Sequence, residues 1–465
     1  MRWLILLGSA LMLVALASCA NVMVMPAPVQ VEPGVPASSP LAEAVLVQQC
    51  RAENCTLYPV ALQAGQPLAG LEPLDLKRYS LQAFSPDGRT LAVVSYHDNT
   101  TLSDGQLSLV NLQQWQPVTT TLTFDHLGWL LFSPDGAMLL AGSFDQQFNP
   151  TSVTFTLVQI ARQQIVAQAT VPFLPRLVRF TPDGRGVMVY GIDSWQYGAV
   201  SDARPHVALL DAADLSLTWQ TTLAEVRDGM YLLAPADHPE EDTISWSPAV
   251  VAAPDRPALY LVHADEDRLT VVEFDRRRVA TVAVAPRLSW VERLLMLTAR
   301  PAYAKVLNGT SKQAVVSPDG RYLYVVGTTY DYHEQEQTLT PLGLQVVESA
   351  TGAEVAQLLS AAESVALAPD GERLYLHGWH RDPSKPYAAA WTEVVTTDHL
   401  EVIGRIEGYH LTPSRRLDGQ PVLLASGVQQ NGQTGFGIVD PVTLEMVHTW
   451  AGDGGGWWVL PEGMR

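Results

Sequence analysis

A five-residue turn motif recurs along this chain and constrains its fold more than any other feature. Complete copies, which end in Pro-Asp-Gly, occupy residues 84–88, 132–136, 180–184, 316–320 and 367–371. Degraded copies occupy 252–256 and 411–413, the second with its Asp-Gly displaced to 418–419. A Ser-Pro-Asp-Gly sequence matches the residue preferences of a type I turn. Seven such turns therefore punctuate the chain, with their prolines at 86, 134, 182, 254, 318, 369 and 413.

The segments between these turns share one strand pattern. An apolar or alternating run follows each turn, as at 91–95 and 138–142, and a loop separates it from a third run, as at 107–111. A short turn then leads to a fourth run, as at 118–123. Seven antiparallel four-stranded units at this spacing predict an all-β fold, a seven-bladed β-propeller.

The repeats also resemble a known group of proteins. Their Ser-Pro-Asp-Gly-type turns are similar to those of bacterial propellers of the WD-repeat-like and Tyr-Val-Thr-Asn-type families, over residues 56–450. The Trp-Asp and Gly-His pairs of strict WD repeats are missing, so the resemblance implies the architecture and no subfamily. Residues 56–71 read as an additional strand pair, which could close the ring or begin a partial eighth blade; we predict seven blades.

One segment departs from the repeat pattern. Residues 286–303 lack turn signals and place apolar residues at 290, 294 and 297, which is helical spacing. We predict a short inserted helix near 288–300. It would pack against the side of the propeller or, as the alternative, dock a partner or contact lipid.

The first residues indicate export from the cytoplasm. A single basic residue, Arg2, precedes an apolar stretch at 4–17, and Leu16-Ala17-Ser18-Cys19 follows. This sequence resembles the bacterial lipobox, which implies a signal peptide at 1–18, acylation of Cys19 and a Pro-rich tether at 19–45, with the propeller at 46–465. The protein would then be anchored by lipid to the cell membrane or outer membrane, facing outside the cytoplasm. An ordinary signal peptide or a retained anchor is the alternative.

Two cysteines remain in the predicted mature chain, Cys50 and Cys55. A close pair outside the cytoplasm favours a disulfide bond. A metal site is the alternative, but the sequence offers neither a second cysteine pair nor a neighbouring histidine to complete four ligands.

The charge balance excludes some classes of partner. The chain has 29 Lys and Arg against 48 Asp and Glu, a formal net charge of −19. A nucleic-acid-binding protein needs a basic surface, so we predict no nucleic-acid partner. Electrostatic adhesion to anionic lipid is disfavoured for the same reason, which leaves the lipid anchor as the contact with the membrane.

The meander topology places the candidate ligand site on one face. Turns between the first and second strands share a face with those between the third and fourth, and the longer connections emerge on the other face. Long loops on a rigid scaffold commonly carry binding sites. Aromatic, His and Asp residues gather in these loops, and the candidates are Tyr96, His97, Asp98, Asp145, Trp195, Tyr197, Asp265, Tyr330, Asp331, His333, Trp379, His380 and Asp382.

Each group in this set has a structural explanation beside the functional one. An Asp follows the motif proline by 11 to 13 residues in six repeats, Asp193 included. Asp commonly starts a turn by accepting backbone hydrogen bonds, whereas a ring of carboxylates would attract cations or basic partners. The aromatic residues could pin the loops, stack on sugars or cover apolar ligands.

The sequence carries no strong catalytic signal. It contains no Gly-x-Ser-x-Gly elbow, phosphate-binding loop or free cysteine nucleophile, and no spacing typical of a metal site. We therefore predict no catalytic residues, metal or cofactor, and a non-catalytic module that binds an unknown protein or ligand through the long-loop face. The alternatives are a lactonase-type or quinone-dependent dehydrogenase-type enzyme with its site at the central channel, and a structural spacer.

Overall fold

The computed structural model describes residues 41, 44–51, 54–62, 66–77, 80–96, 102–193, 204–232, 243–286, 308–333, 336–381, 388–416, 420–428, 434–451 and 456–459. The predicted signal peptide, Cys19 and the predicted helix near 288–300 lie outside the described residues. Within these ranges the helical content is one 3₁₀ turn, η1 (Ile160–Arg162). No helix in the described part of the chain is long and apolar enough to cross a bilayer.

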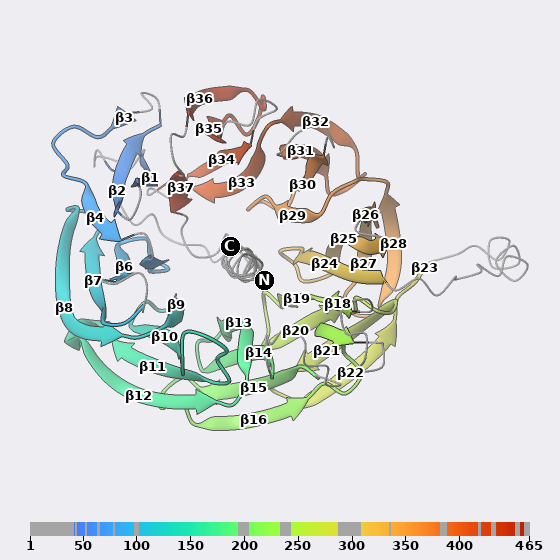
Figure 1. The fold of residues 1–465 in the computed structure, drawn as a ribbon, viewed down its shortest axis with the longest axis horizontal. Helices are drawn as coiled ribbons and strands as arrows, with labels where there is room; N and C mark the ends of the chain where they lie inside the picture. The colour runs from blue at the N-terminus through green and yellow to red at the C-terminus, as the bar shows by residue number, and fades with distance from the viewer. Residues whose placement is uncertain are drawn as a thin grey trace, which may run out of the picture.

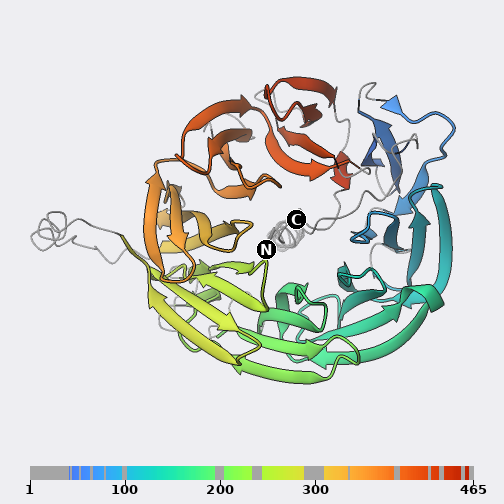
Figure 2. The same cartoon turned by 180° about the vertical axis from the view of Figure 1, so that it is seen from behind.

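Eight antiparallel sheets follow one another around a ring, and Figures 1 and 2 show it from its two faces. The prediction of a β-propeller with four-stranded blades is confirmed, but the prediction of seven blades is wrong. We number the blades 1 to 8 in chain order. Seven of them, blades 2 to 8, each correspond to one copy of the turn motif.

The strands of blades 2 to 8 run from the inner to the outer edge in chain order (Figure 1). Blade 2 contains β5 (Ser80–Phe84), β6 (Thr90–Ser95), β7 (Gly105–Asn111) and β8 (Gln116–Phe124). Blade 3 contains β9 (Leu127–Phe132), β10 (Met138–Phe144), β11 (Val153–Gln159) and β12 (Gln164–Val171). Blade 4 contains β13 (Leu174–Phe180), β14 (Gly186–Ile192), β15 (His206–Asp211) and β16 (Leu217–Thr222).

The same order continues around the ring. Blade 5 contains β19 (Ala249–Ala252), β20 (Ala258–Val262), β21 (Arg268–Glu273) and β22 (Arg278–Ala283). Blade 6 contains β24 (Asn308–Val316), β25 (Tyr322–His333), β27 (Leu344–Glu348) and β28 (Ala353–Leu358). Blade 7 contains β29 (Ser364–Leu367), β30 (Arg373–Arg381), β31 (Ala388–Thr396) and β32 (Val402–Glu407). Blade 8 contains β33 (His410–Arg415), β34 (Pro421–Val428), β35 (Thr434–Val439) and β36 (Met446–Ala451).

Blade 1 closes the ring with strands from both ends of the chain. Its inner strand is the C-terminal β37 (Gly456–Val459), which pairs antiparallel with β1 (Ala44–Arg51). β2 (Asn54–Ala61), β3 (Gln66–Pro67) and β4 (Leu74–Lys77) complete it. Because the chain does not run directly from β37 to β1, this blade needs no Pro-Asp-Gly turn. Counting the motif therefore gives one blade too few.

The β1–β2 hairpin contains the paired cysteines. Cys50 and Cys55 are opposite each other in the antiparallel register. Cys55 is buried and disulfide-bonded, and Cys50 is the partner that the sequence predicts.

Two further hairpins are attached to blade 6. The first consists of β17 (Gly229–Leu232) and β18 (Thr243–Ser247), and β18 pairs in parallel with the inner strand β24. The second is formed by β26 (Glu336–Pro341), which pairs with the long extension of β25. On the outer side, the short β23 (Ala285–Pro286) pairs with β28.

Side-chain hydrogen bonds explain why the turn motif repeats. In blade 3 the Ser133 hydroxyl donates to Asp135 Oδ1 at 2.6 Å, and Asp135 accepts the backbone N–H of Ala137 at 3.0 Å. The backbone N–H of Met138 donates to Ser133 Oγ at 2.9 Å. Gly136 ends the turn at φ +70°, a conformation that is unfavourable for residues with a side chain but not for glycine. The same network recurs in blades 2, 4 and 6.

The Pro-Asp-Gly turns of neighbouring blades also pack against one another. A Cβ added to Gly184 would lie 3.6 Å from Pro134 of the preceding blade, and one added to Gly371 would lie 2.7 Å from Pro318. The proline of one blade thus fills the space beside the glycine of the next. The motif fixes the contact between blades as well as the turn within each blade.

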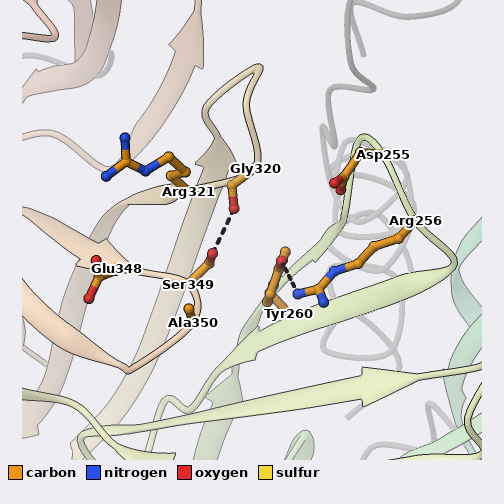
Figure 3. A pocket seen from close by; sticks show the side chains of 8 residues that line it. All are labelled: Asp255, Arg256, Tyr260, Gly320, Arg321, Glu348, Ser349 and Ala350. Atoms are coloured by element: carbon orange, nitrogen blue, oxygen red, sulfur yellow. Dashed lines mark hydrogen bonds between the residues drawn. The ribbon is translucent and has the colours of Figure 1, made fainter.

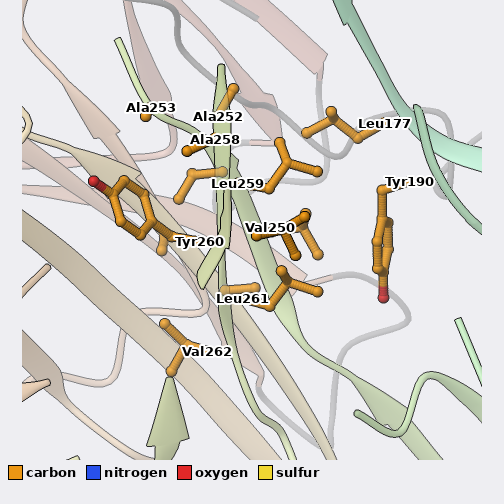
Figure 4. Packing of buried hydrophobic residues seen from close by; sticks show 14 of the residues in the cluster. Leu177, Tyr190, Val250, Ala252, Ala253, Ala258, Leu259, Tyr260, Leu261 and Val262 are labelled. Carbon is orange, nitrogen blue, oxygen red and sulfur yellow. The ribbon is translucent and has the colours of Figure 1, made fainter. Parts of the chain in front are cut away.

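The hydrophobic core lies between the blades. All residues of β14 and β20 are buried, because each blade is covered on both faces by its neighbours. Figure 4 shows Tyr190 and Leu177 of blade 4 on one side of blade 5 and Tyr260 on the other. The core cluster continues into blade 6.

Candidate functional site

The strand order separates short and long connections onto opposite rims. Turns between the first and second strands of a blade contact those between the third and fourth, as when the Leu112 N–H donates to the Arg89 carbonyl at 2.9 Å. We call this side the short-turn rim. Connections between the second and third strands, and between blades, lie on the other side, the long-loop rim, where the sequence predicts a ligand site.

A pocket of about 240 Å³ in accessible volume opens between blades 5 and 6 on the short-turn rim (Figure 3). The degraded turn at 254–257 contributes Arg256, which stands where other repeats have glycine. Its guanidinium donates to the Tyr260 hydroxyl at 2.8 Å and lies 3.6 Å from Glu273. Across the pocket, the Ser349 hydroxyl donates to the Gly320 carbonyl at 2.6 Å. This arginine is engaged in holding its own blade together.

A second pocket, of about 340 Å³, lies between blades 2 and 3 and reaches the long-loop rim. We call it the rim pocket. The connection between β8 and β9 and the loop after β10 contribute its acidic groups, and β11 and β12 contribute most of its hydroxyl and amide groups. Its lining residues are Thr123, Phe124, Asp125, His126, Ser143, Phe144, Asp145, Thr154, Thr156, Ile165 and Gln168. The described lining therefore combines two aromatic rings and two carboxylates with five Ser, Thr and Gln side chains, and these described residues include no Lys or Arg.

Both carboxylates of the rim pocket are held by their own loops. Asp145 accepts the backbone N–H and the hydroxyl of Thr151 at 3.0 and 2.7 Å. Desolvation raises the pKa of Asp145, but hydrogen bonds from Thr151 and Ser152 outweigh it and hold that pKa below its ordinary value. Asp125 Oδ1 accepts the backbone N–H of Asp104 at 2.7 Å. Both carboxylates are exposed, so their loops position them at the pocket mouth.

A cluster of aromatic and imidazole rings joins blades 7 and 8 on the same rim. The rings of His377 and His410 stack with centroids 5.1 Å apart, and Trp379 meets His410 edge-on at 4.5 Å. His377 Nε2 lies 2.7 Å from the Leu411 carbonyl, and His410 Nε2 lies 3.0 Å from the Gly378 carbonyl. Burial lowers the pKa of His377 to about 3, so both partners of this reciprocal pair stay neutral at pH 7.

The connection between blades 4 and 5 contains a buried ion pair. Asp228 is buried, accepts from Arg176 and accepts the Tyr190 hydroxyl at 2.6 Å. Desolvation raises the pKa of Asp228, against the opposing effect of Arg176. Arg176 sits at a β-bulge in β13, which turns its side chain toward this connection. Arg227, which precedes Asp228, has its Nε 3.5 Å from Asp265 Oδ2 of blade 5. The adjacent residues Arg227 and Asp228 therefore link this connection to blades 5 and 4.

Asp193, another of the repeated aspartates, is also paired. Asp193 Oδ1 lies 2.6 Å from His206 Nε2, whose Nδ1 contacts the Thr222 hydroxyl at 3.1 Å. The structural explanation for the repeated aspartates, local pairing at strand ends, therefore accounts for Asp145 and Asp193.

The structure disperses the predicted site residues around the ring. Tyr96 is 2% exposed, and burial raises its pKa to about 12, while its hydroxyl accepts the Leu127 N–H at 2.7 Å. It is a core residue and lines no surface. Tyr330 and Trp379 are half-buried and His380 is exposed.

Several candidates cannot be placed by their side chains. Outside the described residues lie His97, Asp98, Trp195, Tyr197 and Asp382, and β25 contains Asp331 and His333, whose side chains also lie outside the description.

Two groups of functional interest carry no signal in the sequence. Asp125 and His126 form the tight connection between blades 2 and 3, and His126 adopts φ +47° there. Gln168 lies on an outer strand whose exposed side looks like any solvated strand. All three line the rim pocket only because two blades meet there, which no local pattern reveals.

The described residues hold no metal-binding constellation. They contain no group of three or more His, Cys, Asp or Glu side chains placed to bind one ion. The arrangement most like a catalytic triad is Thr270, His263 and Asp265, with 2.7 Å between the Thr270 hydroxyl and His263 Nε2. Thr270 is 1% exposed, its hydroxyl also bonds to Thr281 at 2.9 Å, and neither pocket reaches it. The Thr270 hydroxyl is therefore not exposed to solvent in this conformation.

Comparison with known proteins supports the fold alone. No family model matches the chain, and no curated protein sequence matches it. A crystal structure of a eukaryotic initiation factor superposes with a TM-score of 0.50 and 12% identity, covering 90% of this chain and 88% of that one. Kuenenia stuttgartiensis hydrazine synthase gives 0.41 and 16% over 78% of this chain and 94% of that one. Dihydro-heme d1 dehydrogenase NirN in complex with DHE gives 0.34 and 17% over 88% and 80%. The likeness to the initiation factor supports the β-propeller architecture, and at such identities none of these likenesses carries a functional argument.

Proposed function

We propose that the protein is a lipid-anchored, extracytoplasmic β-propeller that binds a saccharide, without catalysis, in the rim pocket on its long-loop rim. The observation that carries the proposal is the composition of that pocket. The ring of Phe144 is half-buried and offers apolar surface to a sugar ring, whereas Phe124 is buried in the core, and carboxylate, amide and hydroxyl groups bond the sugar hydroxyls. The absence of Lys and Arg from the lining, in a chain of net charge −19, favours a neutral or amino sugar over an acidic one.

The non-catalytic part of the proposal rests on how the polar groups of the described rim are used. Asp145, Asp193, His377 and His410 all have partners within the fold. A general acid or base needs an approach to substrate within hydrogen-bond reach. In the described rim, these side chains instead hold loops or join blades.

Variants of the rim pocket test the binding site. We expect Gln168→Ala and Asp125→Asn each to weaken binding of the tightest-bound oligosaccharide from a glycan array about tenfold, since each removes about one hydrogen bond or charge contact. Asn at 125 can still accept the Asp104 N–H, so the loop is retained. Isothermal titration calorimetry measures the affinities, and Arg321→Gln on the short-turn rim is the matched control.

Two results would contradict the saccharide proposal. One is an array of neutral and amino sugars with no bound member. The other is an affinity that Arg321→Gln lowers as much as the two rim-pocket variants do. Turnover of the bound sugar would overturn the non-catalytic part alone.

The anchor is tested independently of the pocket. Cys19→Ala should abolish incorporation of a palmitate analogue and release the protein from the membrane fraction, because acylation at this residue supplies the attachment. Labelling of cells that express each form, followed by fractionation, gives the answer. Unchanged labelling of the variant would rule the anchor out.

A further inference from the structure

Two buried polar atoms face each other in blade 5 without a hydrogen-bond partner. His263 Nδ1 and Asp265 Oδ1 lie 3.9 Å apart, and the exposed fractions of the two side chains are 1% and 8%. Elsewhere in the described residues, only the hydroxyls of Thr328 and Ser414 are buried and unpartnered in this way. Buried polar atoms nearly always have a partner, because an unmade hydrogen bond is costly.

In both side chains the second polar atom already has a partner, which fixes the orientation of the unpaired atom. His263 Nε2 lies 2.7 Å from the Thr270 hydroxyl, which bonds in turn to Thr281 at 2.9 Å. The other carboxylate oxygen of Asp265 lies 3.5 Å from Arg227 Nε. The two unpartnered atoms therefore face each other across 3.9 Å.

A lysine from the next blade completes the surroundings. The Lys312 side chain, on the inner strand β24, is 6% exposed, and its Nζ lies 3.9 Å from Asp267 Oδ1. Burial lowers the pKa of His263, and the charge of Lys312 lowers it further. Burial also lowers the pKa of Lys312, against the carboxylates of Asp267 and Asp265, which raise it. Asp267 is 78% exposed, so the cluster reaches from the blade interior to solvent at the long-loop rim.

The chemistry of these atoms selects the group that fits between them. A carboxylate can only accept, so the occupant must donate to Asp265 Oδ1. This excludes carbonyl and carboxylate groups. A cation is disfavoured by Lys312 and Arg227, and two ligands do not hold a metal ion. An ammonium group is disfavoured by Lys312 and Arg227 in the same way as any other cation. A hydroxyl can donate to one atom and accept from the other.

We propose that the gap between His263 and Asp265 is a binding site for one hydroxyl group. The hydroxyl donates to Asp265 Oδ1 and accepts from His263 Nδ1–H, while the Thr270 hydroxyl donates to His263 Nε2. It belongs either to a bound water or to the alcohol group of a small polyol that enters beside Asp267. The site lies between blades 5 and 6, whereas the proposed saccharide site lies between blades 2 and 3. Each proposal can therefore be tested without the other.

Two crystal structures of the full chain test the occupancy and its source. In crystals grown without polyols, we expect one ordered water within hydrogen-bond distance of both atoms. In crystals soaked in glycerol, replacement of that water by a glycerol hydroxyl would identify an alcohol-binding site, and retention of the water would identify a structural water. An empty gap in both structures would overturn the proposal.

A double-mutant cycle gives a second, solution measurement. At pH 7, His263 is neutral, because burial lowers its pKa to about 4, so direct charge coupling between the two side chains is small. If a hydroxyl bridges them, His263→Phe and Asp265→Asn each raise the unfolding equilibrium constant about tenfold, and the double variant raises it by less than the product. Effects that simply multiply would contradict a bridge.

A control separates the bridged pair from an isolated unpaired atom. Thr328→Val removes a buried hydroxyl that has no partner, with little change of shape. Its unfolding constant in urea should be unchanged or lowered. If His263→Phe fails to fold, the two crystal structures still decide the occupancy.

Discussion

At the scale of single residues, the turn motif fixes both local conformation and contacts between blades. Ser–Asp or Thr–Asp hydrogen bonds organise the turns of blades 2, 3, 4 and 6, and the final glycine of these turns takes a positive φ. The sequence predicts these features, because Ser, Pro, Asp and Gly in this order are the residues that a type I turn prefers. The sequence does not show that the proline of one blade packs against the glycine of the next, because that contact joins residues about 50 positions apart.

Two glycine substitutions separate the cost of the turn conformation from the cost of the contact. Gly184→Ala should cost about 1–2 kcal/mol of unfolding free energy, since alanine at φ +71° is strained but meets no close atom. Gly371→Ala should cost about 1–3 kcal/mol more, because its Cβ would lie 2.7 Å from Pro318. Urea unfolding of both variants gives the comparison. Equal losses would mean that the contact between blades contributes nothing.

At the scale of secondary-structure elements, the sequence predicts the strands well but not what joins them. Wholly apolar runs such as β14 and β20 indicate strands buried on both faces. The role of the aromatic and histidine residues between blades 7 and 8, by contrast, is not predicted by the sequence. Trp379 and His380 read as candidates for ligand binding, whereas Trp379 packs on a buried histidine pair that bonds reciprocally to the neighbouring backbone. A pattern of residue types cannot tell a ring aimed at solvent from one aimed at the next blade.

The histidine pair makes stability depend on pH. Burial holds the pKa of His377 at about 3, against about 6.5 in an unfolded chain. The folded state thus binds fewer protons, and this contribution is fully present above pH 6.5 and is lost progressively as the pH falls toward 3. His377→Gln, which keeps a donor for the Leu411 carbonyl, should be less stable than wild type at pH 7 and lose less stability between pH 6.5 and 4. Urea titrations at several pH values measure this, and parallel losses in both proteins would contradict it.

At the scale of the whole molecule, the ring closes with strands from both ends of the chain. The sequence predicts the propeller and detects half of blade 1 at 56–71, but the motif count misses that blade because its inner and second strands are not joined by a turn. Eight blades leave the two rims as predicted by antiparallel order. Of the predicted ligand residues whose side chains the structure describes, Asp145 alone lines the rim pocket. The rest of that pocket arises where two blades meet, and single-sequence patterns do not encode such meetings.

The most direct test of the saccharide site is hydrogen exchange, followed by mass spectrometry, with and without the oligosaccharide that binds most tightly. The rim-pocket proposal predicts slower exchange of the amides at 125–126 and 143–145 on the long-loop rim, with exchange at the turns 86–88, 134–136 and 318–320 unchanged. Protection concentrated at those turns, or spread equally over both rims, would contradict it.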